Sequence, residues 1–282
     1  NDKPGFRALK AWLKGHEIGR IVYEPTGPYH RDFEIAFEAD FPLAKVNPLQ
    51  ARRFAQSRGV RAKTDAVDAR MLADMGQALA LEPDMPAAKD RPVLRELQAA
   101  RAALIKDKVR AQNQLAQQRQ PLTRKLTKAR LRQIKMQIEH IDAAIRRQIE
   151  TCPKRRRTCA LLESIPGIGC IVANTILIEL PEIGTLTKKA TASLAGLAPM
   201  TRQSGRWRGR AFIQGGRKPL RNALYMPALV ACRFNPDMKA KYNQLKEAGK
   251  PSKVAIVAVM RKLLILANTI VKDDRKWTPN RT

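Results

Sequence analysis

Acidic residues are scarce in this sequence of 282 residues, where 25 Asp and Glu stand against 54 Lys and Arg and the formal net charge is +29. The excess is concentrated in the second half: residues 151–282 hold 25 basic and 7 acidic side chains, a difference of +18. Each phosphate that a Lys or Arg neutralises releases condensed counterions and so favours binding. The composition therefore indicates a polyanionic partner, and nucleic acid is the first expectation.

Cysteine is also rare, and the four cysteines are Cys152, Cys159, Cys170 and Cys232. None of them stands in CxxC spacing, so the common zinc-binding patterns are excluded. We expect reduced structural thiols and no zinc site.

Long hydrophobic runs are missing as well. The longest apolar stretch, KVAIVAVMRKLLILANTIVK, is interrupted by Arg261 and Lys262 and falls short of the roughly 20 apolar residues that span a bilayer. We therefore expect no membrane association and a cytoplasmic protein. Hydrophobic residues still make up 44% of the chain, which is ample for packed cores and excludes a disordered tail.

The first part of the chain alternates between strand and helix patterns. IGRIVYE and PLAKVNP read as short strands, and helices are expected at PGFRALKAWLKG, at YHRDFEIAFEAD, near ARRFAQSRG and from Asp65 through MLADMGQAL. This alternation predicts an α/β layer with a largely parallel sheet. Because two strands are too few for a stable open sheet and the chain begins at Asn1, we expect the domain to lack its first strands on the N-terminal side.

From Leu94 the pattern changes to long, polar helix. The residues with 3-4-3-4 spacing, typical of a coiled-coil seam, are Leu131, Ile134, Ile138, Ile141 and Ile145. Pro121 breaks the helix, so a helical hairpin is plausible. Such a connector would dimerise or hold two domains apart, and a helix packed on its own domain is the alternative.

The segment LLESIPGIGCIVANTILIEL has the form of a helix-hairpin-helix. Gly167 and Gly169 permit a tight turn whose backbone N–H groups lie at a helix N-terminus and could bind phosphate oxygens without reading sequence. A plain structural turn remains the alternative.

A basic, glycine-rich insert follows in MTRQSGRWRGRAFIQGGRKPLR. Its candidate nucleic-acid contacts are Arg202, Arg206, Trp207, Arg208, Arg210, Arg217, Lys218 and Arg221. Arginines around an aromatic side chain and flexible backbone suit a loop that wraps nucleic acid, with the indole free to stack on a base.

Ser204 lies inside this insert, and its hydroxyl could contact a phosphate or attack one. The only histidines are His16, His30 and His140, all far away in sequence, so no serine–histidine–acid triad is indicated. If Ser204 attacks, a metal ion or a group from another domain must assist it.

Three carboxylates are candidates for that assistance. Asp65 and Asp68 in KTDAVDAR share one face of a helical turn, and Glu24 follows a predicted strand, where ligands bind in open α/β sheets. Carboxylate oxygens are ligands for Mg²⁺ or Mn²⁺, and paired ions could support phosphodiester transfer. The alternative is structural: Asp65 caps the helix and Asp68 interacts with its dipole.

Together these motifs resemble the DEDD-type insertion-sequence transposases, the group of the Piv DNA invertase and the bridge-RNA-guided recombinases. The resemblance rests on these segments, in order: YEPTGPYH, VNPLQARRFAQSRGVRAKTDAVDARMLA, LLESIPGIG, FIQGGRKPLRNALYMPA and VAVMRKL.

The resemblance implies three domains: an N-terminally incomplete RuvC-like (ribonuclease H) domain at 1–92, a coiled-coil connector at 93–150, and a mainly helical transposase domain at 151–282. It assigns Glu24, Asp65 and Asp68 to the metal site and Ser204 to a nucleophile that joins covalently to DNA. The family's first aspartate, on its opening strand, has no counterpart here, so the resemblance implies an incomplete metal site in this chain.

The leading interpretation is a DNA recombinase that excises and inserts an insertion sequence, with DNA, a guide RNA and further copies of itself as expected partners. A RuvC-like junction nuclease that uses water is the runner-up. A non-catalytic helix-hairpin-helix protein would explain the charge but leave the three carboxylates without a role.

Overall fold

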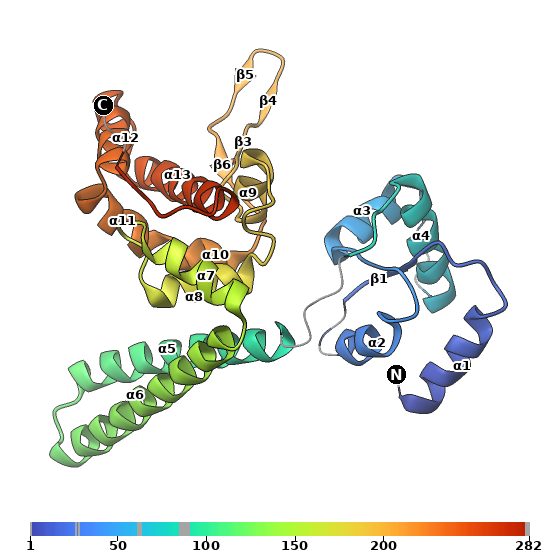
Figure 1. The fold of residues 1–282 in the computed structure, drawn as a ribbon, viewed down its shortest axis with the longest axis horizontal. Helices are drawn as coiled ribbons and strands as arrows, with labels where there is room; N and C mark the ends of the chain where they lie inside the picture. Colours follow the sequence, from blue (N-terminus) through green and yellow to red (C-terminus); the bar gives the residue numbers. More distant parts are fainter. Residues whose placement is uncertain (1, 26, 28, 61–63, 85–90, 280–282) are drawn as a thin grey trace. The chain divides into compact units, whose positions relative to one another are not determined.

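The computed structural model describes residues 2–25, 27, 29–60, 64–84 and 91–279, and these form two compact units, residues 1–88 and 89–282 (Figure 1). The expected boundary after residue 92 lies near this division. The expected connector at 93–150 lies within the second unit.

A parallel pair of short strands organises the first unit. Strand β1 (Ile21–Tyr23) pairs with β2 (Leu43–Lys45), with Ile21 opposite Leu43 and Tyr23 opposite Lys45. The unit's helices are α1 (Lys3–Leu13), α2 (His30–Phe37), α3 (Pro48–Ser57) and α4 (Asp65–Ala78). The strands and helices expected from the sequence are confirmed here.

Two small apolar clusters cover the two faces of this pair. Ile21 and Tyr23 pack with Phe37 of α2 and with residues of α1, whereas Val22 packs with Met71 and Met75 of α4. Successive strand residues point to opposite faces, so one strand of three residues contributes to both clusters. The helices therefore lie as two layers around β1 and β2.

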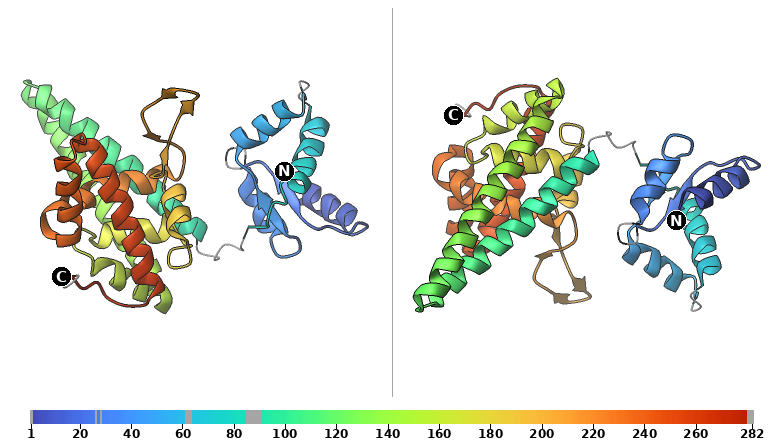
Figure 2. Two further views of the ribbon diagram at one scale, coloured as in Figure 1. Left: turned by 90° about the horizontal axis from the view of Figure 1, so that it is seen from above. Right: turned by 90° about the horizontal axis from the view of Figure 1, so that it is seen from below.

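A helical hairpin begins the second unit. Helices α5 (Arg91–Gln117) and α6 (Pro121–Glu150) run side by side (Figure 2), and Leu131, Ile134 and Ile138 are buried against Ala111 of α5. The apolar seam that the sequence offered for self-association is thus largely used within one chain, which corrects that interpretation. Further along, Ile145 enters the main core of the unit.

The remaining elements form a helical body with a projecting β-hairpin. Its helices are α7 (Pro153–Glu163), α8 (Cys170–Glu179), α9 (Lys188–Leu194), α10 (Lys218–Ala223), α11 (Tyr225–Phe234), α12 (Pro236–Glu247) and α13 (Ser252–Lys272). Its strands are β3 (Pro199–Met200), β4 (Gln203–Ser204), β5 (Trp207–Arg208) and β6 (Phe212–Ile213). The expectation of a mainly helical C-terminal region is confirmed.

Helix α13 lies at the centre of this body. It is the one helix among the described residues that is long and apolar enough to cross a membrane, but half of its apolar window is buried inside the protein. Val259, Leu263 and Ala267 are fully buried against α7, α9, α11 and α12. Such burial is typical of the core helix of a globular unit, which passes the same test of length and composition.

Candidate active site and nucleic-acid interface

The two aspartates of KTDAVDAR lie in the first turn and a half of α4. Thr64 is the N-cap, and its side-chain oxygen accepts a hydrogen bond from the N–H of Val67 at 3.3 Å. The capping role considered for Asp65 is therefore wrong. Asp65 is exposed and Asp68 is half-buried, and neither pairs with another described residue. Both carboxylates lie near the positive end of the helix dipole, where acidic side chains stabilise a helix.

Helix α4 packs antiparallel to β1. Gly76 lies against Val22 so closely that a β-carbon there would be 2.5 Å from Cγ2 of Val22, and Arg20, before β1, donates to the carbonyl of Leu81, after α4. From Val22 to Glu24 is two strand residues, or about 7 Å. From Gly76 back to Asp68 is eight helical residues, or about 12 Å. Glu24 and Asp68 therefore lie at the same end of the strand–helix pair, offset by roughly 5 Å along it.

The described residues nevertheless form no closed metal centre. Across residues 2–25, 27, 29–60, 64–84 and 91–279, no three His, Cys, Asp or Glu side chains lie together as ligands for one ion. The assignment of Glu24, Asp65 and Asp68 to a shared site stays a prediction. Their oxygens are nonetheless the donor type that Mg²⁺ and Mn²⁺ prefer.

A different carboxylate beside the sheet is structural. Glu34 of α2 accepts a hydrogen bond from the hydroxyl of Tyr23 and forms an ion pair with Lys45. Burial alone would raise the pKa of Glu34, but the hydrogen bonds from Lys45 and Tyr23 lower it. Burial and the Glu34 carboxylate raise the pKa of Tyr23. Because Lys45 already neutralises Glu34, this carboxylate is poorly suited to bind a cation.

Ser204 is presented at the end of a two-part hairpin. Strand β3 pairs with β6, and farther out Ser204 of β4 pairs with Trp207 of β5. Gly205 has φ +55° at the first position of the two-residue turn, where a type II′ turn places glycine. The insert was expected to be a loop, and its glycines instead build a tight hairpin that extends from the helices of the second unit (Figure 1).

The side chains of this tip are exposed. Ser204, Arg206, Arg208 and Arg210 are all open to solvent, and Trp207 is 59% exposed. The indole of Trp207 lies over Gly209, where an added β-carbon would be 2.4 Å from the ring. The tip therefore offers a hydroxyl, three guanidinium groups and an aromatic surface together.

Arg202 lies lower on the hairpin, and its guanidinium lies 4.7 Å from the ring centre of Phe212. A cation–π contact of this kind orients the side chain and leaves its outer face accessible.

The arginines at the base of the hairpin have structural partners. Arg217 forms a bidentate ion pair with Glu182 at 2.7 and 2.8 Å and donates to the carbonyl of Glu179 at 2.8 Å. Arg221 donates to the carbonyl of Gly215 at 2.6 Å. Burial alone would raise the pKa of Glu182, but the hydrogen bond from Arg217 lowers it. In this structure Arg217 and Arg221 hold the base together, and their expected role as nucleic-acid contacts stays a prediction. Lys218 is exposed in the first turn of α10.

The turn between α7 and α8 has one packed side and one open side. Gly167 has φ +105°, and a β-carbon there would lie 2.8 Å from the carbonyl oxygen of Pro227 in α11. At Gly169, the N-cap of α8, an added β-carbon would meet nothing within 4 Å. A hollow of about 350 Å³ opens there beside Arg146 of α6. Gly167 thus serves packing, and Gly169 is the accessible residue.

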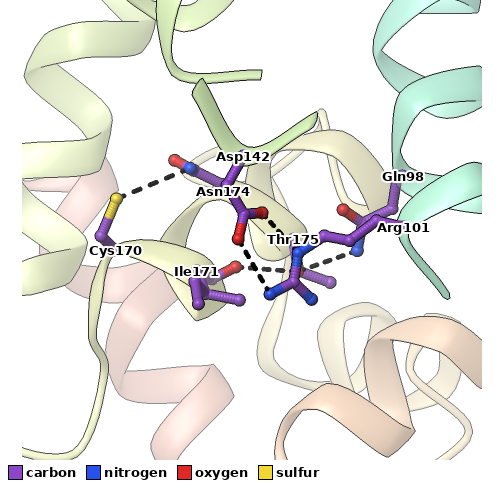
Figure 3. Close-up of polar contacts among 7 residues, drawn as sticks. All are labelled: Gln98, Arg101, Asp142, Cys170, Ile171, Asn174 and Thr175. Carbon is purple, nitrogen blue, oxygen red and sulfur yellow. Dashed lines mark hydrogen bonds and ion pairs between the residues drawn. The ribbon is translucent and has the colours of Figure 1, made fainter. Parts of the chain in front are cut away.

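Polar contacts fix α8 against the helical hairpin (Figure 3). Arg101 of α5 and Asp142 of α6 form an ion pair with two hydrogen bonds, and Gln98 of α5 donates to the hydroxyl of Thr175 at 3.0 Å. The hydrogen bond from Gln98 therefore attaches α8 to the helical hairpin, whose two arms are joined by the Arg101–Asp142 pair.

All four cysteines are free thiols, as expected from their spacing. Burial, assisted by the charge of Glu163, raises the pKa of Cys159 to about 12. A thiol so far from ionisation is a structural group.

Comparisons with known proteins identify the class to which this chain is similar. The family model described as "Transposase IS116/IS110/IS902 family" matches residues 159–243, and a DEDD transposase model of the IS110 type, described as "Transposase", matches residues 1–121. The class is therefore that of DNA transposases and recombinases, which are enzymes.

Among curated relatives, the pilin gene-inverting proteins of Moraxella bovis and Moraxella lacunata are each 29% identical over 98% of this chain and 88% of their own length. A 42 kDa protein of insertion element IS900 from Mycobacterium paratuberculosis is 31% identical over 48% of this chain and 34% of its own length. These matches support an IS110-type transposase.

Proposed function

We propose that this chain cuts and rejoins DNA to move an insertion sequence, with Ser204 as the nucleophile. The observation that carries the proposal is the hairpin tip, which presents an exposed hydroxyl among Arg206, Trp207, Arg208 and Arg210 in a transposase. The guanidinium groups would hold the backbone phosphates on either side of the target bond, and Trp207 would stack on a base.

In the proposed step, the oxygen of Ser204 attacks a backbone phosphorus. A P–O(serine) bond forms while one P–O(deoxyribose) bond breaks, the hydroxyl loses its proton, and the released deoxyribose oxygen accepts one. Attack by the second DNA end reverses this exchange and frees the serine. Nothing is oxidised or reduced, and the number of phosphodiester bonds is conserved.

A serine hydroxyl is a weak nucleophile at neutral pH and needs help to lose its proton. Glu24, Asp65 and Asp68 would hold Mg²⁺ or Mn²⁺, which when bound lowers the proton affinity of an attacking oxygen. The metal dependence is supported by the match to the DEDD transposase model and by the common end of β1 and α4 at which Glu24 and Asp68 lie. A RuvC-like fold for the first unit belongs to the same proposal.

The proposal extends to partners and location. We infer a cytoplasmic protein that acts as a homo-oligomer, because two DNA ends must be joined, and that uses a structured guide RNA. Contacts with nucleic acid would come from the hairpin tip and from the Gly169 side of the α7–α8 turn, as in a helix-hairpin-helix motif.

The test is a denaturing gel of labelled DNA incubated with the protein and Mg²⁺. The proposal expects a cut strand that carries covalently bound protein. Treatment with protease should digest that protein and restore the mobility of the free strand. A cut strand without protein would instead favour a junction nuclease that uses water. Sequencing of copurifying nucleic acid tests the guide RNA, and light scattering tests the oligomer.

A further inference from the structure

The far end of the α5–α6 hairpin is a second strongly charged region. It is remote in sequence from the β-hairpin formed by β3–β6, which carries Ser204 and is called the serine hairpin below. No acidic residue occurs between Asp107 and Glu139. That interval holds nine basic residues: Lys108, Arg110, Arg119, Arg124, Lys125, Lys128, Arg130, Arg132 and Lys135. The acids of the hairpin are gathered toward its other end, where Arg101 pairs with Asp142.

Part of this charge forms one continuous stripe on α6. Lys125, Lys128, Arg132 and Lys135 follow a 3-4-3 spacing, which places them on one face of the helix, and all four are exposed. Among the described residues, no Asp or Glu forms an ion pair with any of these four side chains. The stripe is therefore uncompensated.

The end of the hairpin also has a defined shape. A hollow of about 520 Å³ is lined by Arg119, Pro121, Arg124, Lys125, Lys128 and Arg132. Arg124 donates to the carbonyls of Gln118 at 2.7 Å and Leu115 at 3.2 Å, which ties the turn to both helices. The buried contact of Leu131 and Ile134 with Ala111 keeps the two arms together.

This arrangement costs stability in the free protein. Like charges three and four residues apart on a helix repel each other. The first turn of α6 contains no acid, so cations lie at the positive end of the helix dipole, where they are unfavourable. A polyanion bound along the stripe would remove both costs.

We propose that a basic surface at the far end of the α5–α6 hairpin binds the phosphodiester backbone of nucleic acid. This surface, named here the hairpin stripe, consists of the four α6 residues Lys125, Lys128, Arg132 and Lys135 together with Arg119, which lies between the two helices. Consecutive anions along a backbone match consecutive cations along a helix face, and a contact made only by charge positions nucleic acid without reading its sequence. The inference rests on the proposed function in assuming a nucleic-acid partner, but it needs neither Ser204 nor any strand cleavage.

The test is binding in a Ser204→Ala background, so that strand chemistry does not enter. The stripe variant carries Lys125→Gln, Lys128→Gln and Arg132→Gln, and the matched control carries Lys239→Gln, Lys250→Gln and Lys253→Gln, which are exposed and remove the same charge. The probes are duplex DNA of arbitrary sequence, a stem-loop RNA, and vesicles of phosphatidylserine and phosphatidylcholine.

The proposal expects the stripe variant to bind duplex DNA, the RNA or both at least about tenfold more weakly than the control at moderate salt. On duplex DNA the slope of log affinity against log salt should flatten by roughly 0.9 for each lost contact, or about 2.7 for three. The probe whose binding weakens, DNA or RNA, identifies the nucleic acid that the hairpin stripe contacts. Equal binding by the two variants overturns the proposal, and so does a loss confined to the vesicles.

Chemical footprinting keeps the test decisive if the stripe variant fails to fold. In the Ser204→Ala protein, bound nucleic acid should protect Lys125, Lys128 and Lys135 from acetylation and leave Lys239, Lys250 and Lys253 reactive. Uniform reactivity would overturn the stripe. If the stripe is protected but the protein that retains Ser204 never yields an adduct, the proposed nucleophilic chemistry is refuted. The hairpin stripe as a nucleic-acid contact is not.

Discussion

The tip and the base of the serine hairpin have the same composition and different physical roles. Both are rich in arginine and glycine, yet Arg206, Arg208 and Arg210 at the tip are exposed, whereas Arg217 at the base is engaged by Glu182. Gly205 at the tip has open space around it, and Gly216 at the base lies against the backbone of Gly196. The tip exposes its side chains to solvent, where we propose that they contact nucleic acid, and the base holds the tip in place.

The largest expected effect concerns chemistry at the tip. Ser204→Ala should abolish the covalent protein–DNA adduct, because the substitution removes the hydroxyl proposed to attack, while Ser193→Ala, an exposed serine of α9, should leave it unchanged. The measurement is the amount of labelled strand that carries protein on a denaturing gel. An adduct that persists in Ser204→Ala would identify another nucleophile.

The same variant tests whether one active site is formed by residues of two subunits. If the Ser204 hairpin of one subunit acts with Glu24, Asp65 and Asp68 of another, a mixture of Ser204→Ala with Asp65→Ala should recover cleavage that neither shows alone. An inactive mixture of variants that fold, associate and bind DNA would exclude a shared site.

The next effect is on the stability of the base. In Gly216→Ala a β-carbon would lie 2.1 Å from the backbone nitrogen of Gly196, at φ +63°, so the free energy of unfolding should fall by about 3 kcal/mol or more. Gly215→Ala is the matched control, since Gly215 has φ +72° but no atom within 4 Å of the added carbon. Its cost should be only about 1 kcal/mol, from backbone strain. Urea unfolding measures both, and equal losses would contradict the close packing.

A smaller loss is expected at the ion pair of the base. Arg217→Gln leaves Glu182 partly buried without its partner and should lower the free energy of unfolding by about 1–2 kcal/mol near neutral pH, a range reduced for partial exposure. Because the folded pKa of Glu182 is lowered, its contribution is present above the ordinary carboxyl pKa and is lost as the pH falls through the lowered value. The difference between wild type and variant should therefore shrink in acid. A difference that stays constant down to strongly acidic pH would remove Glu182 from the explanation.

The tip arginines should affect binding and leave stability unchanged. Replacing Arg206, Arg208 and Arg210 by Gln should flatten the salt dependence of duplex binding by roughly 0.9 per lost contact. Urea unfolding should show a change within about 0.5 kcal/mol, since the side chains are exposed. An unchanged slope would remove the tip from the interface.

Local pattern was enough to predict much of this molecule. The strands at Ile21–Tyr23 and Leu43–Lys45, the flanking helices and the break at Pro121 were expected from periodicity and from residues with restricted backbones. Ser204 was placed in an accessible, basic segment because seven basic residues and no acid occur between Arg202 and Arg221. These features depend on neighbours close in the chain, which a sequence displays directly.

Long-range pairing decided the rest. Nothing near Arg217 reveals that Glu182, 35 residues earlier, neutralises it, and nothing in the 3-4 spacing of Ile134 and Ile138 says whether their partner is another chain or α5 of the same one. The sequence by itself determined the elements, the excess of positive charge and the candidate chemical groups, since these follow from residue type and short-range spacing. Only the tertiary structure decided which arginines are free and which apolar seam is already filled. An ion pair or a buried contact depends on the distance between side chains in space, and that distance is fixed by packing of the whole unit.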